Sequence, residues 1–218
     1  IVVDQVNGEV SSPTPDPQLP TPTIVAVENA RTALAPIAAA FYRHPGAAMR
    51  VVGITGTDGK TTTTFLTSAV LEAGGHSTGM MGTVDFKVGA RQWANETRQS
   101  TPEAPEVQAL LREMADAGCG YAVIEATSHA LSARWNRLGG CAFDVALLTN
   151  VTHEHLDFHG SVEQYRRDKA RLFEMLGEDQ RPTTNDQSSS SLVFRPSSLV
   201  SQADKRRKVA IVNADDPH

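Results

Sequence analysis

Short apolar runs alternate with amphipathic segments through most of the chain. Strands are expected at residues 51–54, 121–126, 143–149 and 209–212, with one or two more between 77 and 88. Helical spacing of apolar positions, three and four residues apart, marks residues 60–72, 102–117 and 162–176. This order predicts an α/β fold with a mostly parallel sheet, in which ligands bind at the carboxyl ends of the strands.

Two stretches interrupt this alternation. Residues 13–22 contain five prolines and favour an extended linker, which leads into a short strand at 23–27 and a helix at 30–42 capped by Asn29. Residues 180–204 include a serine-rich stretch with little periodicity, which we interpret as a flexible insertion. We divide the chain at residue 46, so that residues 47–218 form the α/β domain.

Composition and charge argue against several classes of protein, namely nucleic-acid-binding, membrane-spanning and secreted ones. The chain is 40% hydrophobic and 21% charged, with a net charge of -5, which argues against a nucleic-acid surface. No apolar stretch is long enough to cross a membrane and no secretory signal is visible. Cys119 and Cys141 lie in apolar surroundings and are expected to be buried thiols, not a disulfide. We expect a cytoplasmic, monomeric protein that binds neither nucleic acid nor membrane.

The segment Gly-Ile-Thr-Gly-Thr-Asp-Gly-Lys-Thr-Thr-Thr at 53–63 joins a strand end, a glycine-rich turn and a helix start. Gly56 and Gly59 allow a tight turn whose amides face an anion, and the helix N-terminus adds its positive dipole end. Lys60 can reach the β- and γ-phosphates, and the Thr61 hydroxyl can ligate Mg²⁺. The segment predicts ATP or GTP binding, although Ile54 stands where the common phosphate loop has a glycine. The alternative is a glycine-rich turn with a surface lysine.

Polar clusters follow three of the predicted strands, at 55–61, 125–129 and 150–157, and are expected to converge on one cleft. Glu125 is a candidate second Mg²⁺ ligand beside Thr61, the alternative being a strand-end carboxylate paired with a surface lysine. Five potential ligands crowd the third cluster and its continuation: His153, Glu154, His155, Asp157 and His159. Their spacing does not favour zinc, and magnesium is the simpler interpretation.

Three further residues carry little functional information by themselves. Lys169 lies on a predicted helix and would ordinarily be a solvated residue. Ser128 and His129 are adjacent, which does not orient a nucleophile and a base, and no Ser-His-Asp triad is evident from spacing.

Seven motifs in order connect the chain to one family. They are Gly-Thr-Asp-Gly-Lys-Thr-Thr at 56–62, Ser-Thr-Pro at 100–102, Glu-Ala-Thr-Ser-His-Ala-Leu at 125–131, Phe-Asp-Val-Ala-Leu-Leu-Thr-Asn at 143–150, His-Leu-Asp-Phe-His-Gly at 155–160, Tyr-Arg-Arg-Asp-Lys-Ala-Arg-Leu-Phe at 165–173 and Asn-Ala-Asp-Asp-Pro at 213–217. With these motifs the chain resembles the Mur ligases over about residues 23–218, and most closely the MurE type, UDP-N-acetylmuramoyl-L-alanyl-D-glutamate ligases of peptidoglycan synthesis.

The resemblance implies a role for each matching residue. The ATP phosphates would be bound by Gly56, Thr57, Asp58, Gly59, Lys60, Thr61 and Thr62, and Asn150 would line the nucleotide cleft. Magnesium would be held by Thr61, Glu125, His155 and a carbamylated Lys169. The UDP-sugar-peptide would be held by Ser100, Thr101, Ser128 and Arg137, with Arg134 as the alternative to Arg137. Lys60, Lys169 and His155 would carry the catalytic roles.

The implied reaction is ATP-dependent amide formation through an acyl phosphate, adding meso-diaminopimelate or L-lysine to UDP-MurNAc-L-Ala-D-Glu. The implied domains are a central P-loop-type ATPase domain at 47–218, incomplete at its C-terminal end, and the tail of an N-terminal UDP-binding domain at 1–46. The C-terminal domain that selects the amino acid would be absent, so the chain alone is not expected to complete the ligation. Asp58 replaces the commoner Asn of the family loop and is expected to point either away from the phosphates or to metal-bound water.

Two other functions remain open at this stage. One is folylpolyglutamate synthase, an enzymatic relative that shares the loop variant, although the segments at 100–102 and 155–160 argue against it. The other is a non-catalytic nucleotide-binding module. Against it argues the joint presence of five residues: Lys60, Thr61, Glu125, His155 and Lys169. A generic P-loop switch or kinase is the weakest alternative because the loop spacing differs.

Overall fold

The computed structural model describes residues 2–4, 25–97, 99–152, 156–177 and 207–216. The central sheet has the strand order β6-β5-β4-β7-β3-β8-β9. Its strands are β3 (Arg50–Thr55), β4 (Thr78–Met81), β5 (Asp85–Val88), β6 (Arg91–Ala94), β7 (Tyr121–Glu125), β8 (Val145–Leu148) and β9 (Val209–Val212). Five of them, from β4 to β9 in the sheet, are parallel, whereas β5 and β6 form an antiparallel hairpin at one edge.

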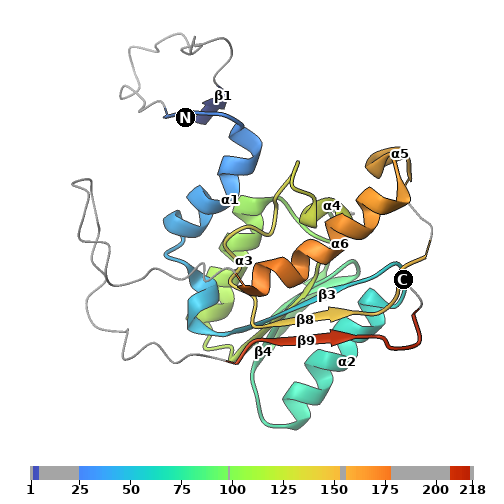
Figure 1. Ribbon diagram of the computed structural model, residues 1–218. Coiled ribbons are helices and arrows are strands. Elements are labelled where there is room, and N and C mark those ends of the chain that lie inside the picture. The colour runs from blue at the N-terminus through green and yellow to red at the C-terminus, as the bar shows by residue number, and fades with distance from the viewer. Residues whose placement is uncertain (1, 5–24, 98, 153–155, 178–206, 217–218) are drawn as a thin grey trace, which may run out of the picture.

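Helices cover both faces of this sheet (Figure 1). The longer helices are α1 (Ala30–Phe41), α2 (Lys60–Ala73), α3 (Ala104–Asp116) and α6 (Val162–Gly177), and the short ones are α4 (Ser128–Leu131), α5 (Leu156–His159) and a 3-10 turn at Pro45–Ala48. Helix α2 lies on one face, while α3 and α6 lie on the other with α1 packed on α3. Two short strands, β1 (Val2–Asp4) and β2 (Val25–Val27), form a separate parallel pair.

The mostly parallel α/β fold expected from the sequence is confirmed, and every predicted strand and helix is present within a few residues. The side chain of Asn29 caps α1 as predicted, because its oxygen accepts from the N–H groups of Arg31 and Thr32. Strand β6 was not predicted, because Arg91–Ala94 shows no apolar alternation. It is a strand because it pairs with β5 and packs Trp93 edge-to-face against Phe86, with 6.0 Å between ring centres.

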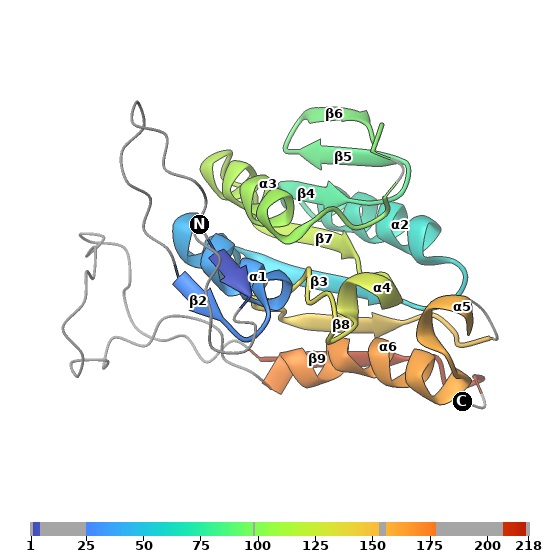
Figure 2. The same ribbon diagram turned by 90° about the horizontal axis from the view of Figure 1, so that it is seen from above.

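The chain reverses direction across the sheet at β3. It leaves β3 through α2 to reach β4, returns to β7 between them, and then crosses to β8 on the other side of β3. The carboxyl ends of β3, β7 and β8 therefore meet at one edge, near α4 and α5 (Figure 2). A reversal of this kind is where parallel sheets bind ligands.

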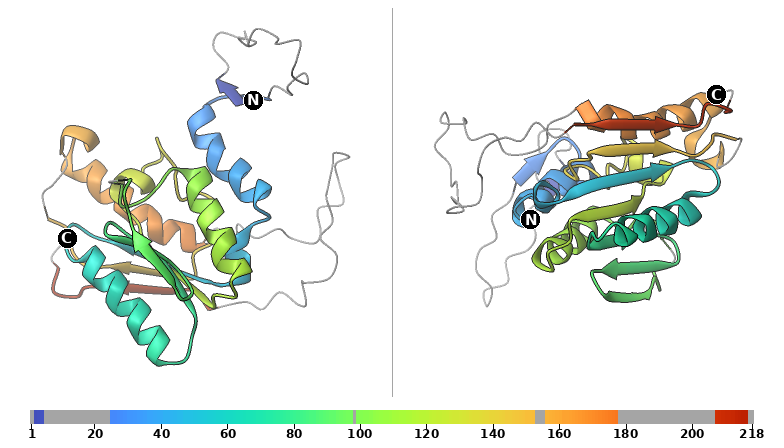
Figure 3. Two further views of the ribbon diagram at one scale, coloured as in Figure 1. Left: turned by 180° about the vertical axis from the view of Figure 1, so that it is seen from behind. Right: turned by 90° about the horizontal axis from the view of Figure 1, so that it is seen from below.

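Side chains of strand β3 pack into two hydrophobic clusters, one on each face of the sheet. Val51 faces the larger cluster with Phe143 and Leu172, whereas Val52 faces the cluster on the α2 side, as the two-residue period of a strand requires. A Cβ at Gly53 would lie 2.6 Å from Leu172 Cδ1, so this glycine lets α6 pack closely on β3. Seen from below, α2 lies along β7, whereas β8 and β9 lie beyond β3 on the other side of the sheet (Figure 3). No helix in the described part of the chain is long and apolar enough to span a membrane.

The two cysteines are free and buried, as predicted. Burial raises the pKa of Cys141 to about 12, and the hydrogen bond from Gln108 opposes this only in part. The thiol is therefore neutral at pH 8, and the stability it contributes is lost only as the pH rises from about 9 towards 12. We expect a Cys119→Ser variant, folded at pH 8, to react with DTNB far more slowly than the same variant in urea. Equal rates in both states would contradict this burial.

Candidate functional site

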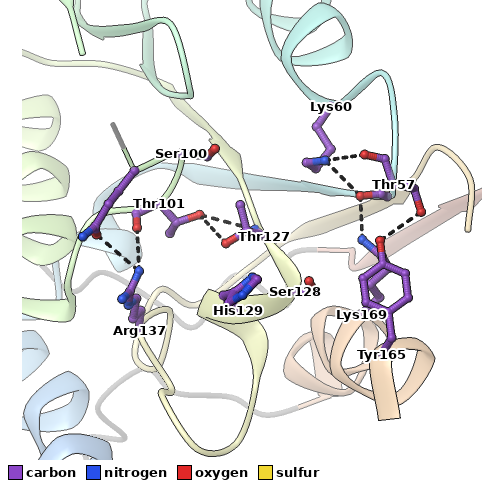
Figure 4. Close-up of a pocket in the computed structure, with 12 residues that line it drawn as sticks. Thr57, Lys60, Ser100, Thr101, Thr127, Ser128, His129, Arg137, Tyr165 and Lys169 are labelled. Atoms are coloured by element: carbon purple, nitrogen blue, oxygen red, sulfur yellow. Dashed lines mark hydrogen bonds between the residues drawn. The ribbon is translucent and has the colours of Figure 1, made fainter. Parts of the chain in front are cut away.

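A cavity of about 310 Å³ opens at the carboxyl edge of the sheet. Its lining residues are Gly56, Thr57, Lys60, Gln99, Ser100, Thr101, Thr127, Ser128, His129, Arg137, Tyr165 and Lys169. Figure 4 shows Thr57, Lys60, Tyr165 and Lys169 on one side and Ser100, Thr101 and Arg137 on the other. The cavity thus joins the predicted phosphate loop to the residues expected to hold a second substrate.

Gly56 and Gly59 of the phosphate loop each require glycine for a different physical reason. At Gly56, with φ of +147°, a Cβ would lie 1.8 Å from the Thr149 hydroxyl oxygen. Gly59 caps α2 with φ of +79° and has open space around it, so only its backbone conformation calls for glycine. The first N–H groups of α2 have no partner within the helix and carry its positive dipole end. The loop and helix start therefore have the form of an anion cradle.

The third polar cluster does not line the cavity in its described part, contrary to the expectation of three converging loops. Instead, Asn150 and Thr149 brace the phosphate loop from behind. The Asn150 amide oxygen accepts from the Asp58 N–H at 2.9 Å, and the Thr149 hydroxyl donates to the Asp58 carbonyl at 2.6 Å. The Thr57 N–H donates to the Asn150 carbonyl at 2.9 Å. The Asp58 side chain is exposed.

Two lysine ammonium groups bind the same loop carbonyl. Lys60 Nζ donates to the carbonyls of Gly56 at 3.1 Å and Thr57 at 2.7 Å. Lys169 Nζ donates to the Gly56 carbonyl at 2.6 Å and lies 4.4 Å from the centre of the Tyr165 ring. Two positive charges are thus held at the loop, where phosphate oxygens would be neutralised.

The interpretation of Lys169 as an ordinary solvated helix residue is wrong. The residue is only 3% exposed, because α6 turns its inner face to the loop. Tyr165, Asp168, Lys169 and Leu172 occupy the buried stripe at three- and four-residue spacing. This periodicity was visible in the sequence, and it places the polar Asp168 and Lys169 on the apolar side of the helix.

Arg137 forms the opposite wall. Its guanidinium donates to the Thr101 carbonyl at 3.2 Å and the Gln99 amide oxygen at 3.3 Å, and pairs with Glu103 at 2.6 Å. The alternative candidate, Arg134, is exposed and is not among the lining residues. The structure therefore brings Arg137, and not Arg134, together with Ser100 and Thr101.

Glu125 lies at the carboxyl end of β7 with no exposed surface. Its carboxylate accepts from the Thr83 N–H at 3.2 Å and the Thr83 hydroxyl at 2.7 Å, and the same hydroxyl lies 2.7 Å from Ser100 Oγ. Thr83 therefore connects Glu125 to Ser100 on the cavity wall, and Glu125 is not paired with a surface lysine. Among the described residues, no three His, Cys, Asp or Glu side chains are grouped as metal ligands, and His155 lies outside those residues.

Two lining residues, Gln99 and Tyr165, were not predicted, whereas Thr127 and His129 were expected only as members of the polar cluster at 125–129. Gln99 directly adjoins Ser100, and Tyr165 precedes Lys169 by one helical turn, so proximity in sequence was their signal. The Tyr165 hydroxyl lies 2.9 Å from the Thr57 hydroxyl and so joins α6 to the phosphate loop.

A hydrogen-bonded row that spacing did not reveal reaches the cavity through Ser128. Asp168 Oδ2 lies 2.6 Å from His159 Nδ1, and His159 Nε2 lies 3.0 Å from Ser128 Oγ. The neighbour in sequence, His129, instead stacks on Phe158 at 3.9 Å between ring centres. Packing of α6 beside α4 brings these three distant residues together.

Replacing Gly56 with alanine is expected to destabilise the protein far more than replacing Gly59. The Gly56 variant must displace Thr149, at a cost of about 3 kcal/mol, whereas Gly59→Ala costs about 1 kcal/mol for its left-handed backbone. Urea unfolding of the two variants measures the difference. Adding Thr149→Ala should recover part of the Gly56→Ala loss, and equal destabilisation by both glycine variants would refute the steric explanation.

The residues present fit nucleotide phosphates. A glycine turn too tight for a Cβ, a helix N-terminus and two lysines bound at the Gly56 carbonyl together favour a polyanion. Thr61, at the second position of α2, and Glu125 offer the hard oxygen atoms that Mg²⁺ prefers. On the far side, Arg137 and hydroxyl groups suit a second anionic, hydrogen-bonding molecule. Such a site is suited to moving a phosphoryl group between two substrates.

Comparison with known proteins supports a single family. The family model described as Mur ligase middle domain matches residues 54–197. The chain is 68% identical over 203 residues to a UDP-N-acetylmuramyl-tripeptide synthetase of Roseiflexus sp. (strain RS-1), covering 93% of this chain and 36% of the relative. It is 37% identical over 220 residues to a UDP-N-acetylmuramoyl-L-alanyl-D-glutamate--2,6-diaminopimelate ligase of Geobacter metallireducens, covering 100% of this chain and 38% of the relative.

Among solved structures, one of a UDP-N-acetylmuramoyl-L-alanyl-D-glutamate--2,6-diaminopimelate ligase superposes with a TM-score of 0.63 at 25% identity, covering 94% of this chain and 34% of that chain. The chain thus spans about a third of the length of these relatives. The family match over more than half of the chain and the identity to both relatives lead to one conclusion: the chain belongs to the Mur ligase family.

Proposed function

We propose that this chain contributes the nucleotide-binding part of an ATP-dependent ligase that adds the third amino acid to UDP-MurNAc-L-Ala-D-Glu during peptidoglycan precursor synthesis. The names of the relatives support this reaction. The observation that carries it is the cavity in which Lys60 and Lys169, both bound to the Gly56 carbonyl, face Arg137 and the hydroxyl-rich wall. The enzyme would act in the cytoplasm, as a monomer.

On the phosphate side, the proposed roles follow from charge and geometry. Lys60 and the free amides at the start of α2 would bind the β- and γ-phosphates, with Thr57, Asp58, Gly59 and Thr62 completing the loop. Asn150 would keep the loop in its binding shape through its contacts with the Asp58 peptide. The lysine charge offsets the negative charge that develops as the γ-phosphoryl group moves to the acceptor carboxylate.

On the acceptor side, Ser100, Thr101, Ser128 and Arg137 would hold the UDP-sugar-peptide. Arg137 is held in place by three neighbours, so it would present its charge with little loss of side-chain freedom. This arrangement would direct the substrate carboxylate towards the phosphate loop. The amine of the incoming amino acid would then attack the carbonyl carbon of the acyl phosphate, forming the amide and releasing phosphate.

The metal-binding roles remain proposals for Thr61, Glu125, His155 and a carbamylated Lys169. Magnesium bound there would supply positive charge that neutralises the transferring phosphoryl group. The carboxylate of Glu125 is buried and oriented by Thr83, which suits a fixed ligand. We also propose that residues 1–46 belong to a UDP-substrate-binding domain and residues 47–218 to the central ATP-binding domain.

The test measures phosphate release from ATP by the full-length protein. We expect release to require UDP-MurNAc-L-Ala-D-Glu together with diaminopimelate or lysine, because the acceptor carboxylate and the amine are both consumed. Dihydrofolate with glutamate serves as the matched control for a folylpolyglutamate synthase. Release with the folate pair, or nucleotide binding without release under any condition, would overturn the proposal.

A further inference from the structure

The row Asp168–His159–Ser128 leads from the protein interior to the cavity wall. The side chains of His159 and Asp168 are 0% and 4% exposed, whereas Ser128 is a lining residue of the cavity. A bound molecule can therefore touch Ser128, and the two buried residues act on it only through the hydroxyl group. The residues come from α4, α5 and α6, so the row also joins these three helices.

Asp168 determines which nitrogen of His159 carries the proton. Its Oδ2 lies 2.6 Å from His159 Nδ1, and its Oδ1 accepts from Gln164 Nε2 at 3.0 Å. Both oxygens thus face nitrogen atoms, as an ionised carboxylate, which only accepts, requires. The proton of an uncharged imidazole then lies on Nδ1, and Nε2 is left as an acceptor.

The polarity of the Ser128 hydroxyl follows from this tautomer. Because Nε2 accepts, the Ser128 hydroxyl donates its proton to His159 across 3.0 Å. Its remaining lone pairs are then available to the cavity, where Ser128 acts as a hydrogen-bond acceptor.

An acceptor is chemically distinct from the charged residues that line the cavity. Lys60 and Arg137 can only donate, so they suit carboxylate or phosphate oxygens. We propose that Asp168 and His159 are positioning residues that hold Ser128 as an acceptor for an N–H or O–H group of the acyl substrate. This inference rests on the proposed function and adds the polarity of one contact, which fits an amide N–H or a sugar hydroxyl but not an anionic oxygen.

The kinetic test uses the full-length enzyme with Ser128→Ala, His159→Phe and the double variant. The phenylalanine keeps the ring and removes both nitrogens. We expect each single change to raise the KM for the UDP-linked substrate about tenfold, as loss of one hydrogen bond does, with kcat and the KM for ATP within about twofold. The double variant should also stay near tenfold, because both changes remove the same contact. A rise to about a hundredfold, or no rise for His159→Phe, would overturn the inference.

A matched pair of carboxylate variants separates positioning from stability. Asp168→Ala should raise the same KM several-fold. Asp144→Ala also removes a buried carboxylate, but one that accepts from the Val51 N–H at the opposite end of β3, and it should leave this KM within about twofold. Thermal unfolding of each variant fixes an assay temperature at which all are folded. Equal KM effects of the two variants would indicate a merely structural role.

The tautomer itself can be observed without activity. In protein labelled with ¹⁵N-histidine, the ring-nitrogen shifts of His159, assigned by comparison with His159→Phe, are expected to show a protonated Nδ1 and an unprotonated Nε2. A proton on Nε2, or on both nitrogens, would make His159 the donor to Ser128. The serine hydroxyl would then be free to donate its own proton into the cavity, which would overturn the inference. If the wild-type enzyme released no phosphate with the muramyl substrate, the proposed function would fail, while these spectra would still decide the polarity of Ser128.

Discussion

Replacing Lys60 with methionine is expected to lower the rate of ATP-dependent phosphate release about a thousandfold. The ammonium group lies at the phosphate loop, 2.7 Å from the Thr57 carbonyl and 3.1 Å from that of Gly56, at the start of α2. Methionine keeps an unbranched side chain only one atom shorter and removes the charge. The charge that develops on the transferring phosphoryl group then loses a fixed positive partner.

The matched control is Lys87, a lysine that pairs with Glu72 and does not line the cavity. Lys87→Met is expected to leave the rate within about twofold, because a peripheral ion pair contributes little. Initial rates of phosphate release, at saturating ATP and at limiting ATP, separate loss of binding from loss of turnover. A Lys60→Met enzyme that kept more than a tenth of the wild-type rate would show that the loop does not bind the reacting phosphate.

Replacing Lys169 with alanine is expected to lower the same rate about a hundredfold. To form the proposed carbamate, the ammonium group first loses a proton. The neutral amine then adds to CO₂, a nitrogen–carbon bond forms and a second proton is released, so a cation becomes an anion. The residue is buried beside the Gly56 carbonyl and the Tyr165 ring, which isolates this group from bulk water. Its charge therefore acts on the phosphate loop with little screening.

Chemical rescue distinguishes the two possible charges of Lys169. The cavity left by Lys169→Ala should accept a small ion that replaces the missing group. Acetate is expected to restore part of the activity if the working group is the carbamate, and ethylammonium is not. Rescue by ethylammonium alone would show that the ammonium form is the active one, and wild-type activity that is insensitive to removal of bicarbonate would agree with that result.

The local elements of the fold were largely predictable. Asn29 caps α1 and the Gly56–Gly59 turn opens α2, because both features are set by the backbone conformations and hydrogen bonds of a few consecutive residues. Strand β6 was not predictable in this way. It gains its hydrogen bonds from β5, and its sequence has no alternation of its own.

The candidate site was predictable in part. The loop residues and Ser100–Thr101 were recognised from their motifs, and the cavity contains them. The choice between Arg137 and Arg134 depended on how the chain turns after α4, where Asn136 adopts a φ of +46°. The predictions for His155 and for the insertion at 180–204 concern residues outside the described part of the chain.

The sequence by itself determined the order of most strands and helices, the phosphate loop and the motifs that indicate the family. Each of these features depends on residues that are close together along the chain. Only the tertiary structure decided that Lys169 contacts the phosphate loop and that a hydrogen-bonded row runs from Asp168 to Ser128. Both depend on the close packing of α6 on β3, which Gly53 permits and which joins Lys169 to Gly56 across 113 positions. Contacts of such separation arise from the packing of whole elements, a property that no local pattern of residues contains.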